Sequence, residues 1–241
     1  MNFSSGCSYE QSLVLSEKLL PERKERVSKL KNNDAARKQI LTGLFFQHCL
    51  EKVMGQPITD IKLLYNEHGK PYLFNNDIYF NMSHSGDNVV MAFCDSEVGV
   101  DIERMNGKRL NVAKRCFCKE EYEDIISSGN EEEQSRRFLE YWTMKEAFVK
   151  CCGAGLKIPL NSFRLTDDGD VYIAGFVRDD ERYVDYNLER FSRFDSFPVR
   201  SIMFDEEYNI AVCLYDKKQL IENALTVKKV NFEAVFDNES F

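Results

Sequence analysis

The sequence has few histidines, no long apolar run and no cysteine pattern that marks a fold. Its three histidines, His48, His68 and His84, are far apart. The eight cysteines form no CxxC pair and no His/Cys cluster, which excludes the usual zinc sites and favours free thiols in a reducing compartment over disulfides. No stretch approaches the roughly 20 apolar residues that span a bilayer, and the N-terminus lacks a basic start followed by an apolar run. We therefore expect a soluble, cytoplasmic protein with no membrane partner.

The sequence also lacks an excess of positive charge: 32 Lys and Arg stand against 40 Asp and Glu, which gives a formal net charge of −8. Non-specific nucleic-acid binding depends on clustered Lys and Arg that neutralise phosphates, so no nucleic-acid partner is expected. One segment reverses the balance: Arg104 to Lys119, "RMNGKRLNVAKRCFCK", has six basic residues and no acid. The segment is either a solvated helix face or a docking patch for an acidic partner.

Length and composition allow a substantial core, since 43% of the 241 residues are hydrophobic. Residues 9–31 are predicted to be helical, and so are residues 32–55, with Asp34 as the N-cap and Gly55 at the end. Within residues 61–76 we expect a strand that leads to a Gly-Lys-Pro turn at 69–71. Two short strands follow, 78–85 and 88–95, joined by a hairpin turn at Gly86 and Asp87.

The strand "VGVDIE", residues 98–103, is followed by a second series of elements. Helices are predicted around 109–126 and 134–152, and strands within 163–179 and 208–216; the stretch after Lys217 has no clear pattern. Each half thus has helices followed by strands, without a residue-level repeat. This order predicts an α+β protein of two similar lobes, 1–96 and 97–241, with "VGVDIE" near their junction.

Two carboxylates stand two residues apart in this apolar strand. Side chains at i and i+2 lie on one face, so Asp101 and Glu103 should point the same way. Two like charges about 5 Å apart repel by roughly 3 kcal/mol at an effective dielectric constant near 20. An arrangement this costly calls for a nearby positive charge.

A third carboxylate comes from the helix "QSRRFLEYWTMKEAFVKCCGAGL". Glu146 and Lys150 are spaced i, i+4, and alone they form an ordinary exposed pair. Together with Asp101 and Glu103, however, Glu146 completes a set of oxygen ligands that suits Mg²⁺, which often bridges carboxylates to substrate phosphates. A bound cation would turn the repulsion between the acids into attraction.

Donors for a phosphate lie upstream of the acids. Lys70 is on the "HGKP" turn, Ser83 and His84 are at a strand end, and Arg37 is in the first turn of a helix, where free N–H groups favour anions. Each also has a simpler interpretation: Lys70 as a solvated turn residue, His84 as a hairpin cap and Arg37 as a surface charge.

These motifs resemble a known family. "GKPYLFNNDIYFNMSHSGDNVVMAFCDSEVGVDIE", then "FCKEEY", then "YWTMKEAFVKCCGAGL" is similar to the 4′-phosphopantetheinyl transferase superfamily in its long, surfactin-synthetase-activating form, over roughly residues 34–165. The resemblance implies a monomeric pseudo-dimer of two α+β lobes with coenzyme A in the cleft between them. It also implies transfer of the phosphopantetheine arm of coenzyme A to a serine of an apo acyl or peptidyl carrier protein, with release of adenosine 3′,5′-bisphosphate.

The resemblance further implies roles for single residues. It places Mg²⁺ on Asp101, Glu103 and Glu146; Mn²⁺ stays open as an alternative, since both ions accept oxygen ligands. It assigns coenzyme A binding to Arg37, Lys70, Pro71, Ser83, His84, Lys145 and Lys150. On this basis Glu146 is the expected general base, directly or through a metal-bound water positioned with Glu121, and Lys150 neutralises or protonates the leaving phosphate.

Carrier proteins of this kind are small and acidic, so the resemblance favours a docking role for Arg104 to Lys119. Two alternatives remain: a non-catalytic coenzyme A or nucleotide-binding protein on the same fold, and an interaction domain in which Asp101 and Glu103 are a solvated strand edge. The sequence does not identify whether the carrier serves fatty-acid, polyketide or non-ribosomal peptide synthesis.

Overall fold

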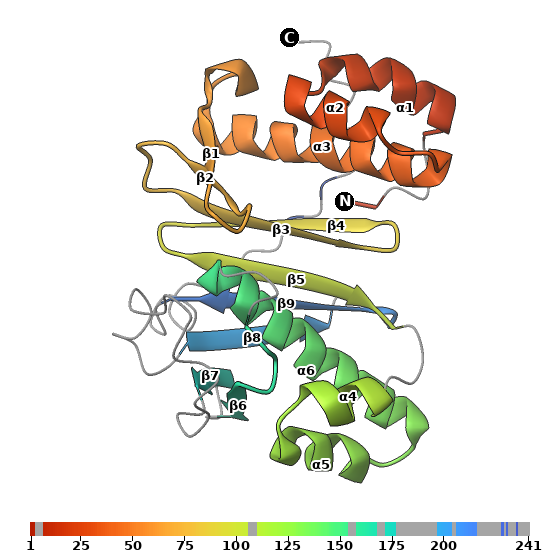
Figure 1. The fold of residues 1–241 in the computed structure, drawn as a ribbon, viewed down its shortest axis with the longest axis vertical. Coiled ribbons are helices and arrows are strands. Elements are labelled where there is room, and N and C mark those ends of the chain that lie inside the picture. Colours follow the sequence, from red (N-terminus) through yellow and green to blue (C-terminus); the bar gives the residue numbers. More distant parts are fainter. Residues whose placement is uncertain are drawn as a thin grey trace.

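The computed structural model describes most of the chain in two groups of elements. The described residues are 1–2, 7–105, 110–153, 158–167, 172–176, 197–203, 206–215, 228, 230 and 235. Figure 1 shows helices α1 to α3 at one end, strands β3, β4, β5, β9 and β8 across the middle, helix α6 running across the sheet, and helices α4 and α5 at the other end. This confirms the α+β class. No described helix combines the length and the apolar character that crossing a membrane requires.

The first group packs three helices over two antiparallel hairpins, β1–β2 and β3–β4. Helix α3 begins where the Asn32 side chain accepts a hydrogen bond from the Ala35 amide, and it ends at Gly55, whose φ of 66° favours glycine. The elements are α1 (Tyr9–Leu15), η1 (Ser16–Lys18), α2 (Pro21–Ser28), α3 (Asn33–Met54), η2 (Ile58–Asp60), β1 (Leu63–Tyr65), β2 (Pro71–Leu73), β3 (Tyr79–Ser85) and β4 (Asn88–Cys94).

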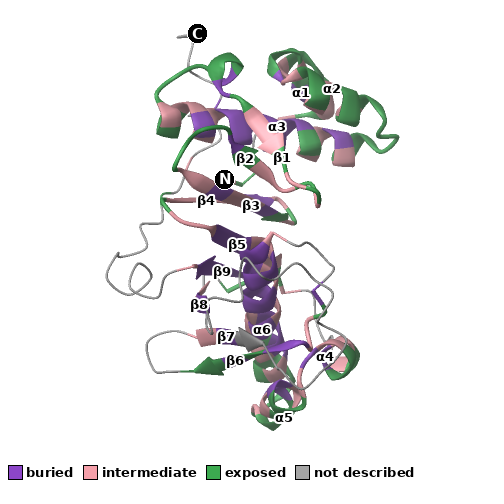
Figure 2. Ribbon diagram, turned by 60° about the vertical axis from the view of Figure 1, so that its left-hand side comes forward, coloured by how far each residue is buried: buried purple, intermediate pink, exposed green. Residues whose placement is uncertain are grey.

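The second group is a five-stranded antiparallel sheet, in the order β5-β9-β8-β7-β6, with α6 against one face. Its elements are β5 (Val98–Arg104), α4 (Leu110–Cys116), α5 (Lys119–Ser127), α6 (Glu131–Cys152), β6 (Phe163–Asp167), β7 (Tyr172–Phe176), β8 (Phe197–Met203) and β9 (Tyr208–Leu214). The apolar stripe predicted for α6 is buried, as Figure 2 shows for this helix; it consists of Phe138, Tyr141, Met144 and Phe148.

Several predicted boundaries are wrong. Residues 9–31 do not form one helix, because Pro21 has no amide hydrogen to continue it and instead begins α2. Asp34 lies inside the first turn of α3, where it binds Arg37, and Asn32 is the cap. The helix predicted over 109–126 is two helices, since Cys118 is the N-cap of α5. Strand β8 was not predicted at all.

The hairpin predicted around Gly86 and Asp87 is confirmed, with Ser85 opposite Asn88. Strand β3 of this hairpin lies beside β5 (Figure 1), yet the two belong to different sheets and no strand pairing joins them in the described part of the chain. The join between the two groups therefore depends on side chains, and the candidate site is built there.

Candidate functional site

Alternation along β5 divides its side chains between two environments. Val98, Val100 and Ile102 are buried in a cluster with β9 residues on one face. The intervening residues point to the other face, where Asp101 is paired with Ala211, a member of the core that contains α6. Gly99, Asp101 and Glu103 thus share the face that α6 covers.

Gly99 lets α6 approach β5 closely. A Cβ at this position would lie 2.9 Å from Cys151 Cα, and closer still to Ala147 O and Cys151 N. No side chain fits there, so the helix backbone lies directly on the strand. This contact brings the last turns of α6, with Glu146 and Lys150, beside the acids of β5.

Asp101 is the centre of the site. It is 3% exposed, and its Oδ1 accepts hydrogen bonds from Ser83 Oγ at 2.8 Å and from Lys150 Nζ at 2.5 Å. Lys150 Nζ also donates to Ser83 Oγ at 2.8 Å, so β3, β5 and α6 meet in one triangle. Burial raises the pKa of Asp101, while Lys150 and the hydrogen bonds oppose the shift.

Glu146 lies in the same electrostatic environment. Burial raises the pKa of Glu146, the charge of Asp101 raises it further, Lys150 opposes the shift, and Glu103 adds a smaller increase. The structure therefore brings the three predicted ligands near one another. They are not gathered into a finished ligand cage, because the described residues contain no cluster of three or more His, Cys, Asp or Glu side chains that could hold a metal ion.

The donors nevertheless suit a hard cation. Oδ2 of Asp101 is buried and has no hydrogen-bond partner among the described residues. A buried carboxylate oxygen without a partner is costly unless another group uses it. Mg²⁺ and Mn²⁺ both take oxygen ligands, so Asp101, Glu103 and Glu146 fit the predicted ion.

Side chains of β3 connect it to β5 in place of a strand ladder. Asn81 Oδ1 accepts from the Val100 amide at 3.0 Å, and Ser85 Oγ accepts from the Arg104 amide at 3.0 Å. Ser85 Oγ also donates to Glu103 Oε2 at 3.1 Å. Sequence reasoning assigned Ser83 a phosphate-binding role but missed these contacts, whose only signal is the i, i+2, i+4 spacing of Asn81, Ser83 and Ser85.

Lys70 reaches across the join between the two groups. Its Nζ contacts Glu97 Oε2 at 3.0 Å and donates to Cys151 O at 3.2 Å, at the end of α6. Pro71, the next residue, begins β2. Lys70 is therefore more than a solvated turn residue, since it pairs with a carboxylate and helps to cap the C-terminus of α6.

Arg37 and His84 lie at the end of the β3–β4 hairpin. Arg37 donates to Asp34 at 3.0 Å and lies 3.9 Å from Asp87, in the hairpin turn. His84 is exposed on β3, opposite Val89. The structure thus places both near the turn at Gly86 and Asp87, and His84 directly follows Ser83 on β3, with its side chain on the opposite face of the strand.

Lys145 and Glu121 do not belong to this group. Lys145 is 0% exposed, donates to Leu160 O and Phe163 O, and pairs with Glu121 Oε2 at 2.9 Å. Glu121 is 2% exposed and accepts from the Leu165 amide. Lys145 Nζ thus faces Glu121 and two backbone carbonyls. Its predicted contact with coenzyme A stays a prediction, as does the predicted role of Glu121 beside a metal-bound water.

The chain was compared with known proteins. Residues 97–213 match the model of the 4′-phosphopantetheinyl transferase superfamily, and residues 7–96 match the model "4′-phosphopantetheinyl transferase, N-terminal". A Bacillus subtilis 4′-phosphopantetheinyl transferase is 32% identical over 195 residues, covering 80% of each chain. The chain belongs to the 4′-phosphopantetheinyl transferase superfamily.

Further relatives of this transferase fit the predicted long form. The 4′-phosphopantetheinyl transferase Sfp of Bacillus subtilis (strain 168) is 36% identical over 156 residues, covering 64% of this chain and 69% of Sfp. The human L-aminoadipate-semialdehyde dehydrogenase-phosphopantetheinyl transferase is 27% identical over 235 residues, covering 88% of this chain and 73% of the human protein. The predicted superfamily, the Sfp-like type and the enzyme class are confirmed.

Proposed function

We propose that this transferase moves the 4′-phosphopantetheine arm of coenzyme A to a serine of an apo acyl or peptidyl carrier protein and releases adenosine 3′,5′-bisphosphate. The observation that carries the proposal is Asp101: it is buried, it is bound on one oxygen by Ser83 and Lys150, and its other oxygen has no partner among the described residues. A site for a cation beside a lysine suits a reaction on a pyrophosphate.

Mg²⁺, when bound by Asp101, Glu103 and Glu146, would supply positive charge that offsets the charge of the pyrophosphate. The chain's own residues do the rest. Glu146 accepts the proton of the serine hydroxyl as the serine oxygen forms its bond to the β-phosphorus, and the bond from that phosphorus to the bridging oxygen breaks. Lys150, one helical turn after Glu146, stabilises the departing phosphate by charge or by donating a proton.

Ser83 and Lys70 support the same site in different ways. Ser83 Oγ is hydrogen-bonded to both Asp101 and Lys150. A phosphate oxygen bound beside it would therefore meet the Ser83 hydroxyl and the Lys150 amine together. Lys70, which is followed by Pro71 at the start of β2, donates to Cys151 O and so stabilises the end of α6 that carries Lys150. Arg37 and His84, at the β3–β4 turn, are proposed to meet a more distant phosphate of coenzyme A.

The proposal includes two lobes, residues 1–96 and 97–241, with coenzyme A in a cleft between them. The two family matches meet between residues 96 and 97, and the lack of a ladder between β3 and β5 supports a division there. We also propose that the protein acts as a monomer, because the acids and their supporting residues come from one chain; the cytoplasmic location stays a prediction from the sequence.

The carrier protein is proposed to dock on the segment Arg104 to Lys119. Lys114, Arg115 and Lys119 are exposed on and beside α4 and α5, and Arg104 pairs with Glu207 at 2.9 Å. Lys108 and Arg109, which belong to the same predicted patch, lie outside the described residues. The exposed cations suit an acidic carrier despite the net charge of −8.

The test is to incubate the protein with coenzyme A, Mg²⁺ and several apo carrier proteins, and to measure the carrier mass. The expected result is one phosphopantetheine added to the carrier serine, lost when the metal is removed with a chelator and restored by Mg²⁺ or Mn²⁺. If no carrier gains mass while coenzyme A still binds, the protein is a nucleotide-binding protein on this fold. If the affinity for coenzyme A were the same with and without the metal, the proposed metal-binding role of Asp101, Glu103 and Glu146 would be refuted.

A further inference from the structure

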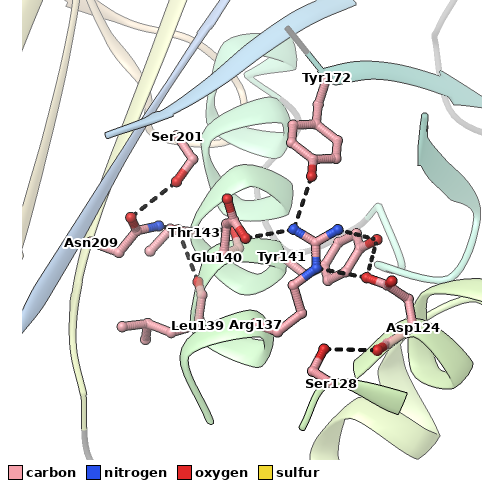
Figure 3. Close-up of polar contacts among 10 residues, drawn as sticks. All are labelled: Asp124, Ser128, Arg137, Leu139, Glu140, Tyr141, Thr143, Tyr172, Ser201 and Asn209. Atoms are coloured by element: carbon pink, nitrogen blue, oxygen red, sulfur yellow. Dashed lines mark hydrogen bonds and ion pairs between the residues drawn. The ribbon is translucent and has the colours of Figure 1, made fainter. Parts of the chain in front are cut away.

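A buried polar chain connects α6 to the sheet beside the proposed site. Asn209 Nδ2 donates to Thr143 Oγ1, and Asn209 Oδ1 accepts from Ser201 Oγ at 3.0 Å. Figure 3 shows Asn209 on β9 between Ser201 on β8 and Thr143 on α6. Thr143 is 0% exposed and Asn209 is 1% exposed, so water does not compete for these bonds.

Thr143 has two roles in this chain. Its hydroxyl donates to Leu139 O at 2.9 Å within α6, and its oxygen accepts from Asn209 across the interface. Glu140 O, at 3.1 Å, is a second acceptor on the same turn, so the hydroxyl hydrogen points back along α6 and the bond from Asn209 then fixes the rotation of the helix on the sheet. An apolar pair would hold the helix without fixing that rotation, because apolar contacts have no direction.

This chain of hydrogen bonds lies next to the acids of the proposed metal site. Asn209 is the direct partner of Glu103 in the β5–β9 pairing. On α6, Thr143 shares a face with Ala147 and Lys150 at i+4 and i+7, and Glu146 is three residues away. Ala147 contacts β5 at Gly99. This helix face is therefore fixed at two points: by the Thr143–Asn209 hydrogen bond to β9 and by the close contact with Gly99 on β5.

We propose that Thr143 and Asn209 are positioning residues for the transfer reaction: their hydrogen bond sets the rotation of α6 that faces Glu146 toward Asp101 and Glu103. This inference rests on the proposed function, because it gives a role to the same three acids. Residues that orient metal ligands through hydrogen bonds commonly change metal affinity and turnover by about 10- to 100-fold when they are removed.

The test compares three variants of the full chain. Thr143→Val keeps the shape and loses the hydroxyl, Thr143→Ser keeps the hydroxyl, and Ser135→Ala is the matched control. Ser135 is also a buried hydroxyl of α6 that donates to a carbonyl four residues back, Glu131 O at 2.8 Å, but it lies two turns before Thr143. For each variant we would measure kcat, the KM for coenzyme A, the melting temperature, and Mn²⁺ affinity by electron paramagnetic resonance.

For Thr143→Val we expect kcat and Mn²⁺ affinity each to fall about tenfold, with the KM for coenzyme A within about twofold of the parent value. Thr143→Ser should retain the parent values, and Ser135→Ala should lower the melting temperature without changing kcat or Mn²⁺ affinity. If Thr143→Val only lowers the melting temperature, as the control does, the bond is structural and the proposal is wrong. Full activity of Asp101→Ala would overturn the metal site itself, an outcome separate from the result for Thr143.

Discussion

The contact between α6 and β5 at Gly99 is a sensitive point of the structure. Alanine at residue 99 would place a methyl group 2.9 Å from Cys151 Cα and nearer still to two other backbone atoms, none of which can rotate away. The helix must therefore move off the strand by about 1 Å to reach ordinary contact distances, since protein interiors have no spare volume. Lys150 and Glu146 would move with it.

Two magnitudes follow for Gly99→Ala. Overpacking in a dense core costs about 1–3 kcal/mol of unfolding free energy. A displacement of about 1 Å at reacting groups can lower turnover by about 100-fold. We therefore expect a folded protein with a kcat near 1% of the parent value, although no reacting group has been changed.

The assay combines urea unfolding with steady-state transfer to a carrier protein. Gly129→Ala is the matched control, because the three atoms nearest to a Cβ there all belong to the Glu133 side chain, whose flexible end can move. The control should retain the parent kcat. Parent kcat and parent unfolding free energy in Gly99→Ala would refute the close approach of α6 to β5 as the cause of the site's geometry.

Three further predictions concern the acids, the buried pair and the basic patch. Asp101→Ala should reduce metal-dependent transfer by at least about 100-fold, measured by carrier mass, with a much smaller effect on the unfolding curve. Lys145→Met should lower the unfolding free energy by about 3–5 kcal/mol, because it leaves Glu121 buried without its cation, while the folded fraction keeps its KM for coenzyme A. Charge reversal at Lys114 and Arg115 should raise the KM for the carrier about tenfold at low salt and leave the KM for coenzyme A unchanged.

Each of these has an opposite outcome. Parent activity in Asp101→Ala would leave β5 as a strand with no catalytic part. A raised KM for coenzyme A in Lys145→Met would support the predicted contact of Lys145 with coenzyme A. For the basic patch, the combined change Lys29→Glu and Lys31→Glu, just after α2, is the control, since both residues are exposed, lie in the first group of elements and give the same change in net charge. An equal effect of both pairs of changes on the carrier KM would mean that only net charge matters.

Local sequence rules predicted the parts of the site that depend on one element. The period of two in "VGVDIE" placed Asp101 and Glu103 on one face, and Gly86 with Asp87 marked the hairpin that carries Ser83. The spacing of Glu146 and Lys150 marked the helix face beside them. These rules work because neighbours along a strand or helix have fixed geometry.

The rest depends on packing between elements, which spacing does not encode. Lys145 precedes Glu146 in the sequence, yet its side chain is sealed by Glu121 and by the carbonyl of Phe163, on segments 24 and 18 residues away. Lys70 pairs with Glu97 for the same reason. Strand β8 contains Pro198, a residue that argues against a strand interior, so the strand was missed although its partner β9 begins at Tyr208, soon after Met203.

The side-chain join between β3 and β5 also protects the protein from self-association. β5 is an edge strand of its sheet, and open edges invite strands from other molecules. Here the backbone amides of Val100 and Arg104 already donate to the side chains of Asn81 and Ser85. Because these partners are side chains, β3 does not extend the sheet as a further strand. The first half of the chain thus caps the sheet of the second half, and residues 97–241 expressed alone would present that edge and be prone to aggregate.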